Sequence, residues 1–197
     1  MREAGRLVVA AAFVVIFAMP LMAQVGAPGT PPGVAQPAPP PATKLEGFEP
    51  AAGSVVTLGY DEIGSLGYGL VSVSVREIRD AKGGSARGLL VEVTESQYRK
   101  ERSFVDADEI PELLKGLDAL LEVKANPTQF KMFEVRYTTR GELQLTVFNN
   151  PRGEVSYAVG AGRMLKAQKF LVEGDMLKLR GLFDAASQKL NATGSGK

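Results

Sequence analysis

Several short stretches of the chain alternate apolar and polar residues, which is the period of a β-strand with one buried face. Residues 71–76 alternate valine with serine or arginine, and residues 89–93 resume the alternation after a turn at 82–85. Residues 97–105 are a further, more polar candidate strand. The first half of the chain therefore predicts a meander of antiparallel strands.

After this meander the period changes to that of a helix. Apolar residues recur three or four positions apart at Ile110, Leu113, Leu114, Leu117 and Leu121. Just before them, Asp106 and Glu109 have the spacing of a capping box, which marks a helix N-terminus. Pro111 suits a first helical turn, where no backbone donor is lost. We therefore predict that a helix begins close to residue 110.

The same order of elements recurs in the second half. Alternation predicts strands within residues 133–138, 143–147, 155–159 and 164–171, with turns at 140–141, 149–153 and 160–162. A second helical stripe follows, formed by Met176, Leu179, Phe183, Ala186 and Leu190. We predict that the tail, residues 191–197, is disordered.

Two runs of strands, each followed by a helix, indicate an α+β domain over residues 45–190, with antiparallel sheet and two helices. The helices echo each other, because Leu114–Leu117 matches Leu179–Leu182 at an offset of 65. An offset of 66 instead aligns Phe104 with Phe170. One helix cannot follow both offsets, so the sequence leaves open whether the halves are a duplicated ββββα unit.

Each predicted helix contains an interior glycine, Gly116 in the first and Gly181 in the second. A glycine inside a helix costs about 1 kcal/mol relative to alanine, so its presence needs a physical reason. We expect both glycines to mark a close approach of the helix to the sheet.

In element order, residues 54–190 resemble the PUR repeat and the Whirly family of single-strand binders. The run Phe104-x-Asp106-x-x-Glu109-Ile110-x-x-Leu113 is similar to one found in small uncharacterised exported proteins of bacteria. That second resemblance implies no known activity. No sequence motif of the PUR or Whirly families is present, and neither resemblance carries a functional residue over to this chain.

Residues 1–23 have the features of a secretory signal peptide. Two arginines precede an apolar run, and Pro20 and Ala23 follow it at positions that suit cleavage before Gln24. The Pro/Gly/Ala-rich composition that follows predicts a semi-rigid linker over residues 24–44. We therefore expect an exported protein, either periplasmic or secreted.

The alternative is that the N-terminal segment is an uncleaved membrane anchor. Residues 7–23 are 17 residues long, which is at the short limit for spanning a bilayer. Membrane contact is expected only if this segment is retained.

The composition excludes several kinds of chemistry. The chain has no cysteine and no histidine, which removes disulfides, thiolate metal sites and nucleophiles that rely on a histidine base. No serine is followed by lysine three positions later, so a Ser-x-x-Lys nucleophile is missing too. Carboxylate chemistry and the binding of hard cations remain, and we expect no cofactor.

The charge balance also bears on the partner. Cleavage after Ala23 would remove two of 23 basic and one of 22 acidic residues, leaving 21 of each. A neutral chain is a poor match for nucleic acid or an anionic membrane, since both attract net positive charge. We expect an envelope or extracellular partner, whose identity the sequence does not give.

The densest group of carboxylates is Asp106, Asp108 and Glu109. These side chains could hold Ca²⁺ or supply an acid–base pair. Capping and charge compensation at a helix N-terminus explain all three without a ligand, and we favour that interpretation. Asp61 and Glu62 are a similar, weaker pair that we place in a turn.

A second candidate site interleaves aromatic and basic side chains on a predicted strand, at Tyr98, Arg99, Lys100, Arg102 and Phe104. Single-strand nucleic-acid binders use such faces to stack bases and pair phosphates. An ordinary strand with solvated basic residues is the alternative. Phe133 and Tyr137 repeat the pattern in the second half, but they share a face with Val135, which favours the core.

These observations favour a non-enzymatic binding or envelope-associated module that works through a sheet face or edge. A carboxylate-dependent hydrolase of envelope polymers is the alternative, and it requires the acidic group to line a pocket, with one raised pKa. A single-strand nucleic-acid binder is the third hypothesis, and it predicts an affinity that falls steeply with salt.

Overall fold

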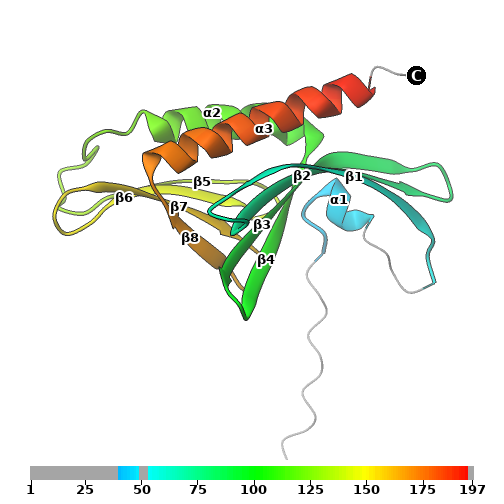
Figure 1. Ribbon diagram of the computed structural model, residues 1–197, viewed down its shortest axis with the longest axis horizontal. Coiled ribbons are helices and arrows are strands. Elements are labelled where there is room, and N and C mark those ends of the chain that lie inside the picture. Colours follow the sequence, from blue (N-terminus) through cyan, green and yellow to red (C-terminus); the bar gives the residue numbers. More distant parts are fainter. Residues whose placement is uncertain (1–39, 49–52, 195–197) are drawn as a thin grey trace, which may run out of the picture. The chain divides into compact units, whose positions relative to one another are not determined.

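A computed structural model describes residues 40–48 and 53–194, and there the chain forms two four-stranded antiparallel sheets with three α-helices (Figure 1). The first sheet has the order β1 (Val56–Leu66), β2 (Val71–Asp80), β3 (Ser85–Ser96) and β4 (Arg99–Asp106). The second has the order β5 (Glu134–Thr138), β6 (Gln144–Asn149), β7 (Val155–Ala161) and β8 (Ala167–Leu171). The α+β class is confirmed.

A long helix follows each sheet in the sequence. A short 3-10 helix, Ala107–Glu109, leads into α2 (Ile110–Leu121), and α3 (Glu173–Gly194) follows β8. Each half thus contributes one four-stranded sheet and one long helix, as a duplicated ββββα unit would. The predicted signal peptide (1–23) and residues 24–39 of the predicted linker lie outside the described residues.

The alternating pattern places one face of each sheet in the core. Val73 on β2 pairs with Val91 on β3, and both side chains are fully buried. In the second sheet Leu145 pairs with Val159, again with both side chains at 0% exposure. Burial of one face explains why these segments alternate, because successive side chains of a strand point to opposite sides.

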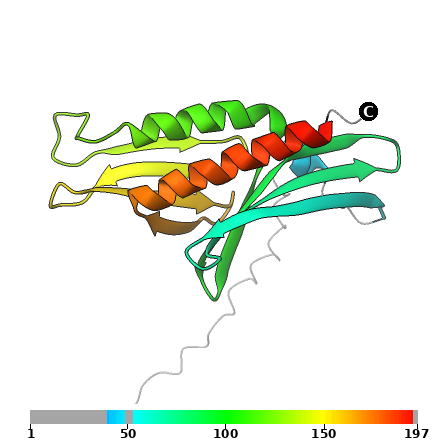
Figure 2. The ribbon, with the colours of Figure 1, turned by 45° about the horizontal axis from the view of Figure 1, so that its top comes forward.

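Each long helix packs on the sheet of the other half. Gly116 of α2 lies against the ring of Tyr137 on β5, and Leu182 of α3 lies against Gly64 on β1. A salt bridge of 2.8 Å between Lys189 and Asp61 joins the end of α3 to β1. Both helices run side by side along one side of the two sheets (Figures 1 and 2). Because each helix packs on the sheet of the other half, neither half buries its apolar surfaces without the other.

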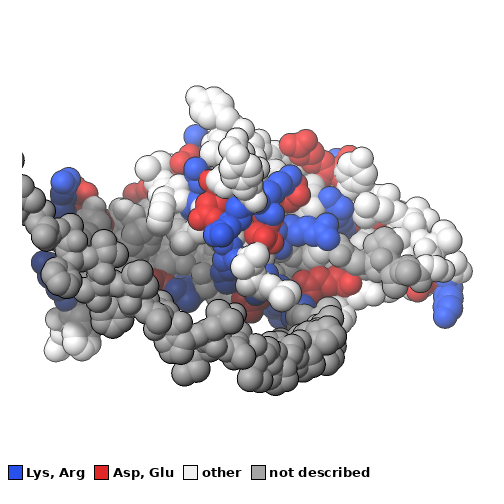
Figure 3. Space-filling view, turned by 90° about the horizontal axis from the view of Figure 1, so that it is seen from below, with Lys and Arg blue, Asp and Glu red and all other residues white. Residues whose placement is uncertain are grey.

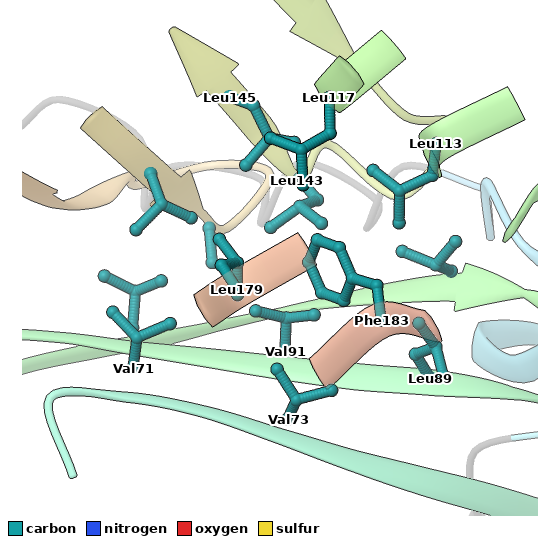
Figure 4. Close-up of a cluster of buried hydrophobic side chains, with 14 of the residues drawn as sticks. Val71, Val73, Leu89, Val91, Leu113, Leu117, Leu143, Leu145, Leu179 and Phe183 are labelled. Carbon is teal, nitrogen blue, oxygen red and sulfur yellow. The ribbon is translucent and has the colours of Figure 1, made fainter. Parts of the chain in front are cut away.

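This packing of each helix on the opposite sheet produces one continuous hydrophobic core. Leucines of α2 and β6 converge on the apolar stripe of α3 and on the valines of β2 and β3 (Figure 4). Phe183 lies near the centre and is fully buried. Burying a side chain of this type contributes about 1.5–3 kcal/mol, so the helices are held by packing.

The opposite face of the first sheet carries a smaller cluster, covered by α1 (Lys44–Gly47), a helix that the sequence analysis does not predict. Leu45 of α1 is fully buried beside Leu90 and Phe104. Arg163 donates a hydrogen bond of 2.9 Å to the carbonyl of Pro40. Residues 40–44, assigned from sequence to the linker, therefore belong to the folded unit.

Three local predictions are wrong. Asp61 and Glu62 lie within strand β1 and not in a turn, because β2 pairs along this whole segment. The predicted tail does not begin at residue 191, since α3 continues to Gly194 with its end held against the first sheet, and residues 195–197 lie outside the described residues. Residues 160–161 belong to β7, which moves the last turn to residues 162–166.

The two helical glycines have different surroundings. A Cβ on Gly116 would lie 2.4 Å from the Tyr137 ring, so the predicted close approach to the sheet is confirmed there. A Cβ on Gly181 would meet no atom within 4 Å. The prediction is wrong for Gly181, which faces open space.

No helix in the described part of the chain is long and apolar enough to cross a membrane.

Candidate functional site

The predicted acidic group lies where β4 passes into α2, but its residues do not act together on a ligand. Asp106 is 1% exposed, and its carboxylate accepts hydrogen bonds from the backbone N–H groups of Lys44 at 2.9 Å and Leu45 at 3.2 Å. These N–H groups belong to the first turn of α1 and have no partner within that helix. Asp106 therefore caps α1, and the predicted capping box with Glu109 at the start of α2 is wrong.

Arg140 neutralises the rest of the group. Its guanidinium lies 3.1 Å from Asp108, 3.3 Å from Glu109 and 3.8 Å from Asp106. Lys44 adds a fourth contact, 3.4 Å from Asp108. All three carboxylates are thus satisfied by cations or backbone donors of the domain.

The electrostatics of Asp108 do not suit a general acid. Partial burial raises the pKa of this carboxyl, but hydrogen bonds from Arg140 and Lys44 outweigh the burial and lower the pKa below its ordinary value. A general acid needs the opposite change. Within residues 40–48 and 53–194, no group of three or more acidic side chains has the geometry to hold a metal ion.

The predicted basic strand is β4, where Lys100, Arg102 and Phe104 share one face and Arg99 points to the other. Tyr98 is 90% exposed at the turn before β4. Arg99 pairs with Glu95 at 3.1 Å, and Lys100 pairs with Glu92 at 3.1 Å. Alternation along the strand sends the side chains of Arg99 and Lys100 to opposite faces.

Arg102 lies over the ring of Phe104, 5.6 Å from its centroid, and Phe104 itself is buried under α1. Seen from the side opposite the helices, basic and acidic side chains are interspersed (Figure 3). The strand is therefore a mixed-charge surface. The core interpretation is confirmed for Phe133, which is 7% exposed, and for Tyr137, which packs against the core.

The most distinctive surface is the outer face of the second sheet, which the sequence analysis does not identify. Phe148 on β6 and Phe170 on β8 lie on this face, because their neighbours Val147 and Leu171 point into the core. The two rings meet edge to face, with centroids 5.9 Å apart and planes at 60°. Phe170 is 68% exposed. We call Phe148, Ser156, Phe170 and Val172 the aromatic face.

Register explains how two residues 22 positions apart in sequence come together. Phe148 pairs with Ser156 on β7, and Phe170 pairs with Ala158, the next outward residue of that strand. The small side chains on the middle strand leave room for the two rings to meet above it. The middle strand thus acts as the floor of the aromatic face.

An open groove of about 450 Å³ lies beside the rings. It is lined by Phe148, Ser156, Phe170, Leu171, Val172 and Asp175. This volume falls within the usual range for small-ligand sites, about 300–1,000 Å³. The groove combines an apolar wall with one hydroxyl and one carboxylate.

Two charged residues beside the aromatic face are paired within the domain. Arg136 on β5 is paired with Glu134 of the same strand, and Asp175 lies 3.8 Å from Lys178. The rings are therefore bordered by neutral polar groups and compensated charges. Such a surface can stack against a ring and hydrogen-bond at its edge, but it offers no acid–base pair.

A signal for this site is present in the sequence. Phe148 follows Val147 in a stretch whose odd-numbered residues are predicted to be buried, so alternation alone places Phe148 on the solvent side. A large apolar residue on the polar face of a strand is the kind of exception that marks a binding surface. The contact between Phe148 and Phe170 cannot be read from this pattern, because it depends on the pairing of strands β6, β7 and β8.

Comparison of the sequence with protein-family models and with curated proteins found no match.

Proposed function

We propose that this chain is a non-enzymatic binding module that holds its ligand on the aromatic face of the second sheet. The observation that carries this proposal is the edge-to-face pair of the half-buried Phe148 and the exposed Phe170, which lies beside an open groove. Two apolar rings in contact on the outer face of a sheet form a contiguous apolar patch, and such patches mark interaction sites.

The state of the acidic group supports a binding role over the hydrolase alternative. Asp106 is committed to capping α1, while Arg140 pairs with Asp108 and Glu109. A hydrolase of envelope polymers needs two carboxyls that converge on a substrate, one of them with a raised pKa. The contacts of Asp106 and the lowered pKa of Asp108 both oppose that arrangement.

We also propose that the module is exported and works at the cell envelope or outside the cell, on a linker formed by the residues after Ala23. Support comes from the signal-peptide pattern of residues 1–23 and the Pro/Gly/Ala-rich composition that follows it.

The proposal is tested first on the native protein. We expect its intact mass to correspond to a chain beginning at Gln24, and fractionation to place it in the periplasm or the medium. An unprocessed chain in the membrane fraction would instead make residues 7–23 an anchor.

The binding role is tested by sedimentation of the purified full-length mature chain with isolated envelope material. We expect co-sedimentation that a Phe148→Ala, Phe170→Ala double variant loses, and that a Tyr68→Ala variant keeps. Tyr68 is the matched control because it is fully exposed on the β1–β2 turn of the other sheet. Equal sedimentation of all three proteins would contradict a role for the aromatic face.

A further inference from the structure

The chemistry of the aromatic face narrows the class of ligand. We infer that it binds an uncharged glycan chain, with one sugar ring on the Phe148–Phe170 pair. This inference rests on the proposed binding function and adds the ligand class to it.

The two rings provide the apolar half of a sugar site. A pyranose presents C–H groups on the faces of its ring and hydroxyls around its edge, so it pairs well with an aromatic surface bordered by polar groups. Phe170, at 68% exposure, is accessible for such stacking, while Phe148 is half-buried and holds the pair in place.

The groove provides the polar half. Ser156 and Asp175 line it together with the two phenylalanines. A serine hydroxyl can donate and accept hydrogen bonds, and a carboxylate accepts from the hydroxyls at the edge of a sugar. Hydrogen bonds to a charged acceptor are the stronger kind, so Asp175 is expected to fix the orientation of the ring.

A second row, with polar side chains at three of its four positions, extends the surface along the strands. Thr138, Gln144, Gly160 and Gln168 pair in register across β5, β6, β7 and β8. This row lies two residues from the row of Phe170, a displacement of about 7 Å along the strand. Amide side chains there can reach the hydroxyls of a neighbouring sugar, which suits a chain better than a single ring.

The charges favour a neutral ligand over a polyanion. Arg136 is the arginine that strands β5 to β8 carry, and it is already paired with Glu134, while the groove itself contains the carboxylate of Asp175. Nucleic acids gain most of their affinity from free lysine and arginine side chains that replace counterions. Asp175 and its partner Lys178, 3.8 Å apart, offset each other, so this pair gives a phosphate chain no net positive charge, whereas sugar hydroxyls would find an acceptor in the carboxylate.

The test measures binding of the full-length mature chain to a panel of uncharged hexasaccharides by titration calorimetry. The panel contains hexamers of α-linked glucose, of β-linked glucose, of N-acetylglucosamine and of mannose. We expect at least one hexamer to bind. Phe170→Ala should weaken the affinity for that hexamer about tenfold or more, because the variant loses one aromatic contact and the area that this contact buries. Asp175→Asn should weaken it less, and Tyr68→Ala should leave it unchanged.

Two further probes separate failure of the ligand class from failure of the binding role. They are a thymidine 20-mer and an uncharged proline-rich peptide, each measured against the wild type and the Phe170→Ala variant. Binding of either probe, dependent on Phe170, without binding of any hexamer would overturn the glycan inference and leave the binding role standing. Binding of no probe, or equal binding by wild type and Phe170→Ala, would overturn both.

Discussion

Asp106 accepts a hydrogen bond from the backbone N–H of Leu45, a residue 61 positions earlier in the chain, at 3.2 Å. A second bond, from the N–H of Lys44, measures 2.9 Å. Because the carboxylate is 1% exposed, it satisfies two donors of α1 in a region with little access to water. The end of β4 therefore fastens the N-terminal helix to the first sheet.

Replacing Asp106 should loosen this attachment. We expect Asp106→Ala to lower the free energy of unfolding by about 1–3 kcal/mol, because one buried and one partly buried N–H donor lose their acceptor. Urea denaturation followed by circular dichroism measures the change. Asp108→Ala is the control, since Asp108 is 54% exposed and its ion pairs should contribute less than about 1 kcal/mol. Equal losses in the two variants would argue against the cap.

The two helical glycines should respond in opposite directions to alanine. Gly116→Ala should destabilise the domain by about 1–3 kcal/mol, because the new methyl group would overlap the ring of Tyr137. Gly181→Ala should stabilise it by about 0.4–1 kcal/mol, since the site is open and alanine lowers the entropy of the unfolded chain. Thermal unfolding of both variants checks the contrast, and a shift of the same sign in both would contradict the packing described for α2.

The contact between the two long helices should make stability depend on pH. Arg180 on α3 donates to both oxygens of Asp118 on α2, at 2.9 and 3.2 Å, and this lowers the pKa of Asp118. A carboxyl whose pKa is lower in the folded state stabilises the fold above its unfolded pKa of about 3.9 and loses that effect as the pH falls through the folded value.

We therefore expect Asp118→Asn to be less stable than the wild type at neutral pH, by less than the Asp106→Ala variant. The difference should begin to shrink as the pH falls below about 4, the ordinary pKa of aspartate, and disappear once Asp118 is protonated in the folded state as well. Denaturation midpoints between pH 2 and 7 would show this convergence. A difference that is constant over the whole range would mean that the ion pair contributes nothing.

Arg87 on β3 should control fraying at the end of α3. Its guanidinium donates a hydrogen bond of 2.6 Å to the carbonyl of Leu190 and another to the hydroxyl of Thr193. A cation near the C-terminal end of a helix interacts favourably with the helix dipole, and Arg87 ties this end to the first sheet. We expect Arg87→Ala to speed hydrogen exchange at residues 187–193 with little effect on α2. Arg79→Ala, which removes an exposed pair with Glu77, should not change exchange there.

The sequence predicts the type of most elements because burial of one face imposes a period that can be counted. Val71, Val73 and Val75 alternate with polar residues, and they form the buried face of β2. Helix α1 has no such signal, since four residues make one turn and contain a single apolar side chain that is buried. Its position depends on Asp106, which local spacing assigns to a different helix.

The candidate sites show the same division. The mixture of charges around Tyr98 and Arg99 is visible in sequence, but the partners that neutralise them depend on hairpin register. Phe148 and Phe170 are separate apolar residues in the sequence. They become one exposed surface because β7 lies between their strands and carries small residues there.

The sequence by itself determined the positions of most strands and of the two long helices, the α+β class and the absence of histidine and cysteine chemistry, but it missed β1 and α1. Each follows from residue types or from local periods, which need no knowledge of distant neighbours. The tertiary structure alone decided that each long helix packs on the sheet of the other half, that Asp106 caps α1 and that Phe148 meets Phe170. These are contacts between residues far apart along the chain, and their energies depend on strand pairing and burial that no local pattern specifies.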